Sequence, residues 1–323
     1  MQINGVEIED TFAEAFPMVA TRAVITAGTP RWAEIAAREA TGYATSVIAC
    51  DAEAGVERPL SPDETPDGRP GVSALFFAFN RDKLEKAVAS RIGQCVMTCA
   101  TTACYNGLPA TEKMIKVGGN LRYFGDGFQM SKVLEEEGSG FRIQGSESAD
   151  GDATEQARHA VKRRFWRVPV MDGEFVCEDR FGTVKGVAGG NFLILAASPA
   201  AALDAAERSV TAIAASVRDV MLPFPGGVVR SGSKVGSKYK KLRASTNDAY
   251  CPTLRGVTKT ALPDGVNAVY EIVIDGLTLD AVQAATRVGV HAACIPDVVR
   301  ISAGNYGGNL GPHHIRLREV MNG

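Results

Sequence analysis

The spacing of hydrophobic residues in the first hundred positions predicts strands that alternate with helices. Short apolar runs are typical of buried strands, and apolar residues three or four positions apart are typical of amphipathic helices. Thr29 followed by Pro30, and later Asn80, are helix start signals. The resulting β-α-β-β-α-β order is that of the ferredoxin-like split βαβ fold. We expect strands at 22–27, 45–50, 72–79 and 94–100, and helices from 30 to 42 and from 80 to 92.

The second half of the chain repeats this order. Ser198 with Pro199, and Thr278, mark the starts of two helices. The pattern therefore predicts an α+β protein of two ferredoxin-like lobes related by internal duplication, at 1–164 and 165–323. We assign the Gly-, Ser- and charge-rich stretch 138–164 to a linker or insertion in the first lobe. Strands of the second lobe are expected at 191–197, 226–232, 267–274 and 298–304.

Composition narrows the possible classes of function. Of the 323 residues 22% are charged and the net charge is −2, which argues against a nucleic acid as partner. No apolar run reaches the length of about 18 residues that a membrane span needs, so we expect none. The N-terminus lacks the basic and then apolar profile of a signal peptide, and we therefore expect the cytoplasm as location.

The seven cysteines and four histidines show no pattern of a metal site. Cys95, Cys99 and Cys104 are spaced as C-x3-C-x4-C, without a C-x-x-C pair or a nearby histidine. An odd number of cysteines at irregular spacing also gives no disulfide framework. We expect buried, reduced thiols and no metal.

A glycine-rich basic loop almost matches a phosphate-binding P-loop. Gly227 and Gly232 have the P-loop spacing, but Ser233 precedes Lys234, the reverse of the order that the motif requires. Glycine N–H groups and the cations of this loop can bind a carboxylate or phosphate. The alternative is a flexible basic surface loop. The polar residues "STND" at 245–248 can orient a heteroaromatic ligand, or they can simply form a turn.

Glu271 is the candidate for acid–base chemistry. It lies in the predicted strand "NAVYEIVI", where strand alternation places it on one face with Val269 and Val273. If that face is covered, loss of hydration raises the pKa of the carboxyl group toward neutrality, which suits a general acid or base. A half-exposed glutamate at the rim of a sheet is the alternative. The chain has no G-x-S-x-G elbow and no dinucleotide fingerprint.

Many segments resemble one enzyme family in the same order along the chain. They include "INGVEIEDTFAEAF", "EATGYATSVIACDAEAGVE", "YFGDGFQ", "GVAGGNF", "PFPGGVV", "SKVGSKY", "ASTNDAYCPT", "VYEIVIDGL" and "ISAGNYGGNLG". They span Ile3 to Gly311 and resemble formylmethanofuran:tetrahydromethanopterin N-formyltransferase. The near-neutral charge and the insertion resemble the bacterial members from methylotrophs, which are subunits of a formyltransferase/hydrolase complex.

The resemblance implies a fold of two ferredoxin-like lobes and a reversible formyl transfer. The formyl group passes between the amine of a methanofuran-type coenzyme and N5 of tetrahydromethanopterin, in bacterial oxidation of formaldehyde to formate. Both coenzymes are co-substrates with anionic tails, and no cofactor is tightly bound. Glu271 matches the proposed catalytic glutamate. The substrate-binding residues that we infer are Gly189, Gly190, Asn191, Ser233, Lys234, Ser237, Lys238, Ser245, Thr246, Asn247 and Asp248.

The resemblance also implies partners. A homo-oligomer, a dimer or tetramer, is expected, together with hydrolase-type subunits of a formyltransferase/hydrolase complex. One alternative function is a scaffold that binds the coenzyme and holds the hydrolase without catalysing transfer. A second alternative, an NTP-binding enzyme, requires Lys234 to contact phosphates.

Overall fold

The computed structural model describes residues 1–47, 50–110, 113–136 and 161–322. The chain forms two compact units that interleave along the sequence. The terminal unit comprises Met1–Met18, Tyr43–Gly55 and Lys185–Gly323, and the middle unit comprises Val19–Gly42 and Val56–Val184. The lobes expected from sequence are contiguous, so they do not coincide with these units, and their boundary at 164 stays a prediction. Most of the predicted insertion 138–164 falls outside the described residues.

The terminal unit is built on an antiparallel sheet. Its four central strands have the order β17-β12-β16-β13, with β12 hydrogen-bonded to β16 on one side and to β17 on the other. β2 extends the sheet by pairing parallel with β17, and β18 pairs with the first part of β3. The strands are β1 (Gln2–Ile3), β2 (Val6–Ile8), β3 (Phe12–Thr26), β12 (Val184–Ala196), β13 (Val220–Met221), β14 (Ser233–Val235), β15 (Ala244–Thr246), β16 (Ala268–Gly276), β17 (Val298–Ser302) and β18 (His313–Arg316).

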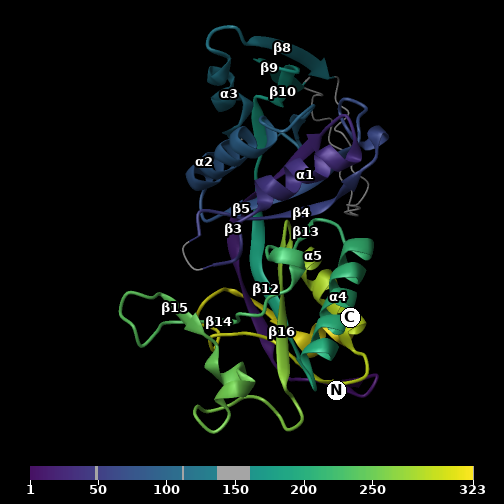
Figure 1. Ribbon diagram of the computed structural model, residues 1–323, viewed down its shortest axis with the longest axis vertical. Coiled ribbons are helices and arrows are strands. Elements are labelled where there is room, and N and C mark those ends of the chain that lie inside the picture. The colour runs from purple at the N-terminus through teal and green to yellow at the C-terminus, as the bar shows by residue number, and fades with distance from the viewer. Residues whose placement is uncertain (48–49, 111–112, 137–160, 323) are drawn as a thin grey trace, which may run out of the picture. The chain divides into compact units, whose positions relative to one another are not determined.

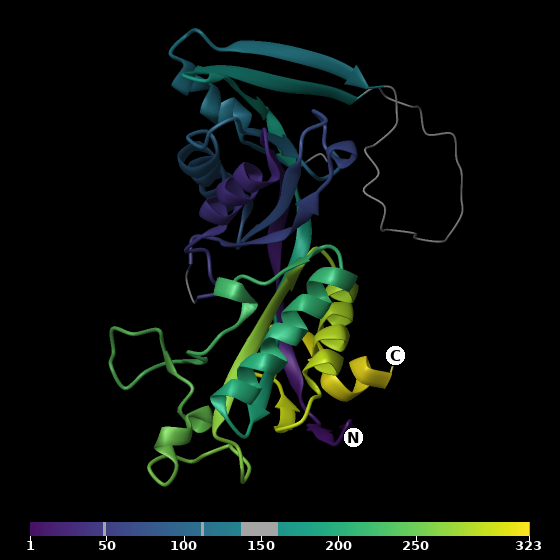
Figure 2. The same ribbon diagram turned by 45° about the vertical axis from the view of Figure 1, so that its right-hand side comes forward.

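Two long helices cover one face of this sheet (Figures 1 and 2). α4 (Pro199–Ser216) and α5 (Leu279–Ala293) lie side by side and are followed at the C-terminus by α6 (Leu317–Asn322). Small residues allow the close approach: the Ser209 hydroxyl of α4 donates to the Gly289 carbonyl of α5 at 2.8 Å. The helices enclose the main core with one face of β16, including Ile272 and Ile274. Residues of the opposite face of β16, which include Glu271 and Asp275, do not face these two helices.

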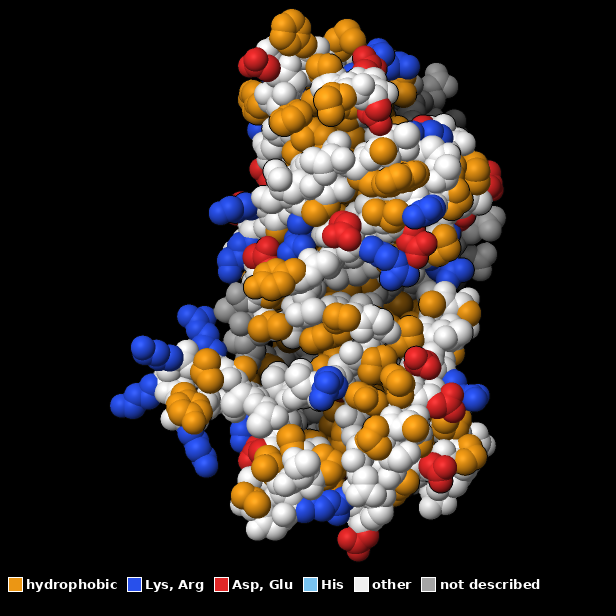
Figure 3. All heavy atoms as spheres, in the orientation of Figure 1, with side chains coloured by type: hydrophobic (Ala, Val, Ile, Leu, Met, Phe, Trp, Pro, Cys, Tyr) orange, Lys and Arg blue, Asp and Glu red, His pale blue; other side chains and the backbone are white. Residues whose placement is uncertain are grey.

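A hairpin of β14 and β15 projects from the terminal unit (Figures 1 and 2). The segments before and after it form short 3₁₀ turns at Pro225–Gly227, Asp248–Tyr250 and Pro252–Leu254. Lys and Arg side chains gather on this projection, as Figure 3 shows. It coincides with the glycine-rich basic loop found in the sequence.

The middle unit has a mixed sheet with the order β4-β5-β3-β6-β10-β9-β8. β6 and β10 are parallel, whereas β3 is antiparallel to both β5 and β6. The helices α1 and α2 pack against β5, and β7 pairs separately with β11. The elements are α1 (Pro30–Thr41), β4 (Glu53–Leu60), η1 (Pro62–Glu64), β5 (Gly71–Ala78), α2 (Arg81–Arg91), η2 (Ile92–Val96), β6 (Ala103–Asn106), β7 (Met114–Lys116), α3 (Gly118–Leu121), η3 (Arg122–Gly125), β8 (Met130–Glu136), β9 (Val161–Val170), β10 (Gly173–Glu178) and β11 (Arg180–Gly182).

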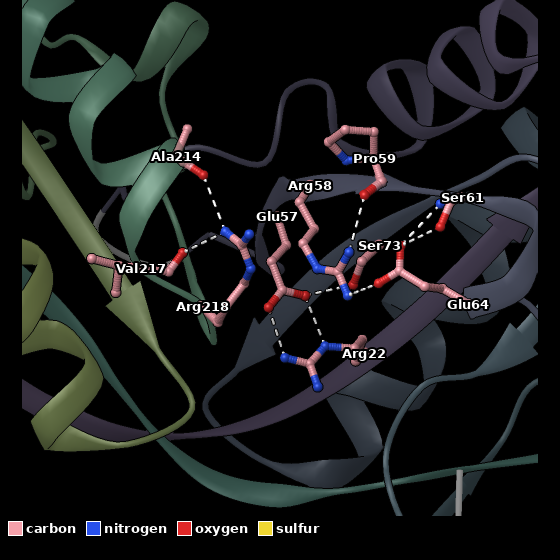
Figure 4. Close-up of polar contacts among 10 residues, drawn as sticks. All are labelled: Arg22, Glu57, Arg58, Pro59, Ser61, Glu64, Ser73, Ala214, Val217 and Arg218. Carbon is pink, nitrogen blue, oxygen red and sulfur yellow. Dashed lines mark hydrogen bonds and ion pairs between the residues drawn. The ribbon is translucent and has the colours of Figure 1, made fainter. Parts of the chain in front are cut away.

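A buried ion pair crosses the sheet of the middle unit (Figure 4). The Arg22 guanidinium of β3 donates two hydrogen bonds to the Glu57 carboxylate of β4, at 2.7 and 2.8 Å. The Ser73 hydroxyl of β5 donates a third at 2.5 Å. Charge-assisted bonds of this kind satisfy polar groups that burial would otherwise leave without partners. They connect three strands of one sheet.

The helix start signals are confirmed. The side chains of Thr29, Asn80, Ser198 and Thr278 each accept a hydrogen bond from the first turn of the helix they precede. Such caps are local, so the sequence reveals them directly.

Three predicted strands are wrong. None of the described residues of 45–50 is in a strand, and the strand of that region is β4, whose Glu53 and Glu57 conceal its apolar pattern. Residues 94–96 lie in the π-helical segment Ile92–Val96 that follows α2, residues 97–100 form turns, and β6 follows later. Residues 226–232 begin in a 3₁₀ turn, and the strand of this region is β13. Short apolar runs do not distinguish a strand from a helical turn.

No helix in the described part of the chain is long and apolar enough to cross a membrane.

Candidate active site

Glu271 lies in the middle of β16, on the face of the sheet that the helices leave open. Its neighbours Ile272 and Ile274 point into the helix-covered core, so strand alternation places Glu271 on the opposite face. In register it lies across from Leu193 of β12, which in turn lies across from Ser302 of β17. Residues directly opposite one another share a face, so these three side chains form one row. The predicted placement of Glu271 in a strand, on the face opposite Ile272, is confirmed.

The surroundings of Glu271 change its acidity. Its side chain is half-buried, and burial raises its pKa to about 7. Its backbone exchanges two hydrogen bonds with Val229, of 2.8 and 2.9 Å, which brings the segment before β14 next to it. A carboxyl group with a pKa near the pH of the cell is both protonated and ionised in similar amounts, so it can donate or accept a proton.

The loop that follows β17 is held by a second glutamate. Glu14 of β3 is buried, and its carboxylate accepts N–H bonds from Tyr306 at 2.8 Å, from Leu310 at 2.7 Å and from Gly308. Burial alone would raise the pKa of Glu14, but these backbone bonds outweigh it and lower the pKa. The loop is therefore ordered around a buried anion. An open cavity of about 400 Å³ lies beside it, lined by residues 308–312 and His314.

Tyr306 connects this loop to the basic hairpin. Its hydroxyl donates to the Ser233 carbonyl at 3.3 Å. Burial raises the pKa of Tyr306, and the charges of Glu271 and Glu14 raise it further. The phenol consequently stays protonated and remains a hydrogen-bond donor close to Glu271.

The hairpin brings together most of the substrate-binding residues expected from the sequence. Ser233 pairs in register with Thr246, and Lys234 with Ser245. Asn247 donates its N–H to the Gly232 carbonyl at 2.8 Å, and Ser237 and Lys238 lie in the turn after β14. Residues 233–248 therefore form one polar structural element.

The charge of the hairpin is mostly free to meet an anion. Lys234 forms an ion pair with Asp248, whose pKa is lowered chiefly by the hydrogen bond from Lys234. Both side chains are partly exposed, and such a pair can open toward solvent at little cost. The same hairpin carries four further cations with exposed side chains: Lys238, Lys240, Lys241 and Arg243.

The three residues Gly189, Gly190 and Asn191 lie in β12 beside a β-bulge. Gly189 has φ +85°, and a Cβ there would meet Phe16 Cε1 at 2.9 Å. A Cβ on Gly190 would meet Val282 Cγ1 at 2.4 Å. The Asn191 amide donates to the carbonyls of Gly189 and Gly304 at 3.2 Å each, and its oxygen accepts the Gly304 N–H at 2.7 Å. These contacts all support the backbone around the site.

Sequence reasoning assigned no role to Glu14, Tyr306, Glu53 or Asp275. All four occur in the segments that carry the family resemblance. Glu14 and Glu53 share a signal that could have identified them, because each is an acid flanked by two alanines in a strand-like stretch, "AEA". An acidic side chain at the buried positions of a strand needs partners, so it marks a structural or functional contact.

The described residues contain no group of three or more His, Cys, Asp or Glu side chains that could hold a metal ion. The cysteines are free thiols, and burial raises the pKa of Cys50 and Cys294 to about 11, so neither is a nucleophile at neutral pH. A carboxyl group with a pKa near 7, a protonated phenol and a basic hairpin suit the transfer of a group between two nitrogen atoms.

Two family models match the chain. The model of formylmethanofuran-tetrahydromethanopterin formyltransferase matches residues 1–143, and the model of the proximal lobe of the same enzyme matches residues 173–320. Each compact unit of the structure contains residues from both matches.

Curated relatives are similar over their full length. The formylmethanofuran–tetrahydromethanopterin formyltransferase of Methylobacillus flagellatus is 54% identical over 99% of this chain and 100% of that protein. One component of the formyltransferase/hydrolase complex of Methylorubrum extorquens is 50% identical over 99% of this chain and 97% of that protein.

Solved structures agree with these relatives. The formyltransferase from Methanosarcina barkeri has a TM-score of 0.86 at 47% identity, covering 99% of this chain and 100% of that chain. A chain of the Methylorubrum extorquens formyltransferase/hydrolase complex, solved with methylofuran, has a TM-score of 0.88 at 48% identity, covering 99% and 98%. The chain therefore belongs to the formylmethanofuran–tetrahydromethanopterin formyltransferase family.

Proposed function

We propose that this protein transfers a formyl group reversibly between the amine of a methanofuran-type coenzyme and N5 of tetrahydromethanopterin. Relatives with about half of their residues identical are named for this reaction, and one solved relative binds methylofuran. Both coenzymes act as co-substrates. The observation that carries the chemical part of the proposal is the half-buried carboxyl group of Glu271, with a pKa of about 7.

Glu271 acts as the general acid and base. The attacking nitrogen adds to the formyl carbon, and the carbonyl oxygen becomes the oxyanion of a tetrahedral intermediate. The ionised Glu271 carboxylate accepts the proton of the attacking nitrogen and returns it to the departing nitrogen as the C–N bond breaks. The forward and the reverse reaction each require one proton to pass from the attacking to the departing nitrogen. The same residue can therefore serve both directions. Hydrogen-bond donors near the carbonyl oxygen stabilise the intermediate. The candidate donor is the Tyr306 hydroxyl, which must release the Ser233 carbonyl to serve there.

The basic hairpin binds the coenzymes. Lys234 and Lys238 attract the anionic tails, and the polar side chains of Ser233, Ser237, Ser245, Thr246, Asn247 and Asp248 provide hydrogen bonds. Gly189, Gly190 and Asn191 contribute by shaping the backbone beside the site. Correct placement of two large substrates accounts for much of the rate enhancement in a reaction of this kind.

The strand orders support a duplicated fold. β17-β12-β16-β13 in the terminal unit and β6-β3-β5-β4 in the middle unit both correspond to the order 4-1-3-2 of the split βαβ motif, each with two helices. We propose two ferredoxin-like lobes on this basis. A homo-oligomer, hydrolase-type partner subunits and the cytoplasm as location also stay proposals. The relative from the Methylorubrum extorquens complex supports the hydrolase partners.

Formyl exchange between the two coenzymes by the purified protein tests the function. We expect Glu271→Gln to lower kcat by about 100-fold to 10,000-fold, the usual contribution of general acid–base catalysis. Glu207→Gln is the matched control, since Glu207 is exposed on α4, which covers the other face of the sheet. A folded Glu271→Gln variant with full turnover would remove Glu271 from the mechanism. Exchange that requires added hydrolase subunits would instead favour a scaffold.

A further inference from the structure

A β-bulge lies opposite Asp275. β12 and β16 pair at Val187 with Gly276 and again at Gly190 with Ile274, so two residues of β12 face the single residue Asp275. Such a bulge leaves an N–H group outside the regular ladder. Here the Gly189 N–H donates to Asp275 Oδ1 at 2.9 Å. Asp275 thereby completes the hydrogen bonding of the bulge.

Asp275 is paired with a second buried acid. Glu53, at the start of β4, is 2% exposed, Asp275 is fully buried, and their carboxyl groups lie within interaction distance of each other. Glu53 Oε2 and Asp275 Oδ2 receive no N–H or O–H bond from any group that the structure describes. Two ionised carboxylates in contact away from water repel strongly. One proton held between the two carboxyl groups removes this repulsion.

A chain of hydrogen bonds leads from this pair to the loop beside Glu271. The Gly189 carbonyl accepts the Asn191 amide, and the same amide side chain is bonded to both backbone groups of Gly304. Gly304 begins the loop that carries Tyr306. Asp275 and Glu271 also share one face of β16, because they are four residues apart in a strand.

We propose that Glu53 and Asp275 share one proton and act as a positioning pair, which fixes the bulge at Gly189 and, through Asn191, the loop that carries Tyr306. The pair touches no substrate. Its importance for formyl transfer rests on the proposed function, whereas the shared proton and its effect on the loop do not.

The surroundings of the pair favour its protonated form. The titratable groups next to it are Cys50, whose thiol contacts Glu53, and Asp51, whose charge acts on that thiol. Neither acid of the pair has a cation as ion-pair partner among the residues described. Burial raises the pKa of Glu53. Burial and the charge of Glu53 raise the pKa of Asp275 well above its ordinary value.

The direction of the pH effect follows from these raised pKa values. The folded state keeps a proton that the unfolded chain loses above its ordinary carboxyl pKa of about 4. The stabilisation is therefore complete below that pH and is lost as the pH rises toward the pKa of the folded pair. In that window each pH unit raises the unfolding equilibrium constant about tenfold for one proton.

The substitution Glu53→Gln keeps the contact between the two side chains but removes the titratable proton that they share. The glutamine amide donates to the Asp275 carboxylate without a titrating proton, so it keeps the net charge of the pair. Urea unfolding of wild type and Glu53→Gln between about pH 5 and pH 8 should show the ratio of their unfolding constants changing about tenfold per pH unit. Glu207→Gln, the control, should remain parallel to wild type. If the unfolding constants of wild type and Glu53→Gln changed with pH in parallel, the proposal of a shared proton would be wrong.

Hydrogen exchange tests the positioning role. Backbone amides of residues 304–310 should be about tenfold or more less protected in Glu53→Ala than in wild type. As the pH rises, the same amides should also lose about tenfold or more of their protection in wild type, whereas those of Glu53→Gln should not. Formyl transfer by Glu53→Ala should fall at least tenfold. Glu53→Gln should restore it and should lack the loss of activity at rising pH that the pair causes, while it keeps the pH dependence that comes from Glu271. Unchanged loop protection in a folded Glu53→Ala variant would overturn the positioning role. If wild type itself transfers no formyl group, the proposed function fails, and the unfolding and exchange results still decide this inference.

Discussion

Replacement of Glu14 by glutamine changes one atom of the buried group that organises the loop beside Glu271. Glu14 Oε1 accepts the N–H groups of Tyr306 and Gly308, and Oε2 accepts that of Leu310. In the variant, the glutamine oxygen can serve only one side of the loop. Its NH₂ group must then face a backbone N–H, so two donors meet where a donor and an acceptor met before.

The size of the effect follows from these contacts. Hydrogen bonds to a charged acceptor contribute about 1.5–3 kcal/mol each, neutral ones about 0.5–1.5 kcal/mol, and a buried N–H without an acceptor costs about 1–3 kcal/mol. Two weakened bonds and one lost bond should reduce the free energy of opening of the loop by about 3 kcal/mol. That corresponds to roughly a hundredfold increase in the open population.

Hydrogen exchange followed by mass spectrometry measures this opening directly. Protection of residues 305–311 should fall roughly a hundredfold in Glu14→Gln, while the strands β12 and β16 keep theirs. Because the pKa of Glu14 is lowered in the folded state, the wild-type loop should also lose protection as the pH falls through that pKa. Glu207→Gln again serves as the control. Protection in Glu14→Gln within a factor of two of wild type would refute the argument that a buried anion orders the loop.

Three further predictions concern the site and its support. In either direction of the reaction, kcat/KM should rise about tenfold per pH unit below about pH 7 and level off above it, and a flat profile would exclude Glu271 as the base. Lys234→Ala should raise KM for the coenzymes at low salt without lowering thermal stability measurably, because Lys234 and its partner Asp248 are both partly exposed to solvent; an unchanged KM would separate the hairpin from binding. Gly190→Ala should lower the free energy of unfolding by about 1–3 kcal/mol, since its Cβ meets Val282, and a stable variant with a raised KM would instead indicate direct contact with substrate.

Local signals in the sequence predicted where the four long helices α1, α2, α4 and α5 begin, whereas α3 and α6 were not predicted. Ser198 and Thr278, each followed by an amphipathic pattern, begin α4 and α5 as expected. Such signals depend on residues within one turn, so no tertiary information is needed. β4 was missed for the opposite reason, because the partners of its acids come from distant parts of the chain, such as Arg22 for Glu57.

The candidate active site likewise combines features that neighbouring residues determine with features that depend on distant parts of the chain. The alternation in β16 was sufficient to place Glu271, and the spacing of glycines and lysines was sufficient to locate a basic loop, but its folding into the hairpin of β14 and β15 was not predicted. The contacts of Glu14 and Tyr306 join residues almost three hundred positions apart, and no periodicity carries that information.

The amino-acid sequence by itself determined the caps and faces of the helices, the strand that carries Glu271 and the family to which the chain belongs, since each depends on residues close together or on motifs kept in order. Only the tertiary structure decided which acids are buried together and what hydrogen-bonds to them. Burial and partner choice set the pKa of Glu271, of Glu14 and of the pair of Glu53 with Asp275, because each carboxyl group responds to the water it has lost and the donors it has gained.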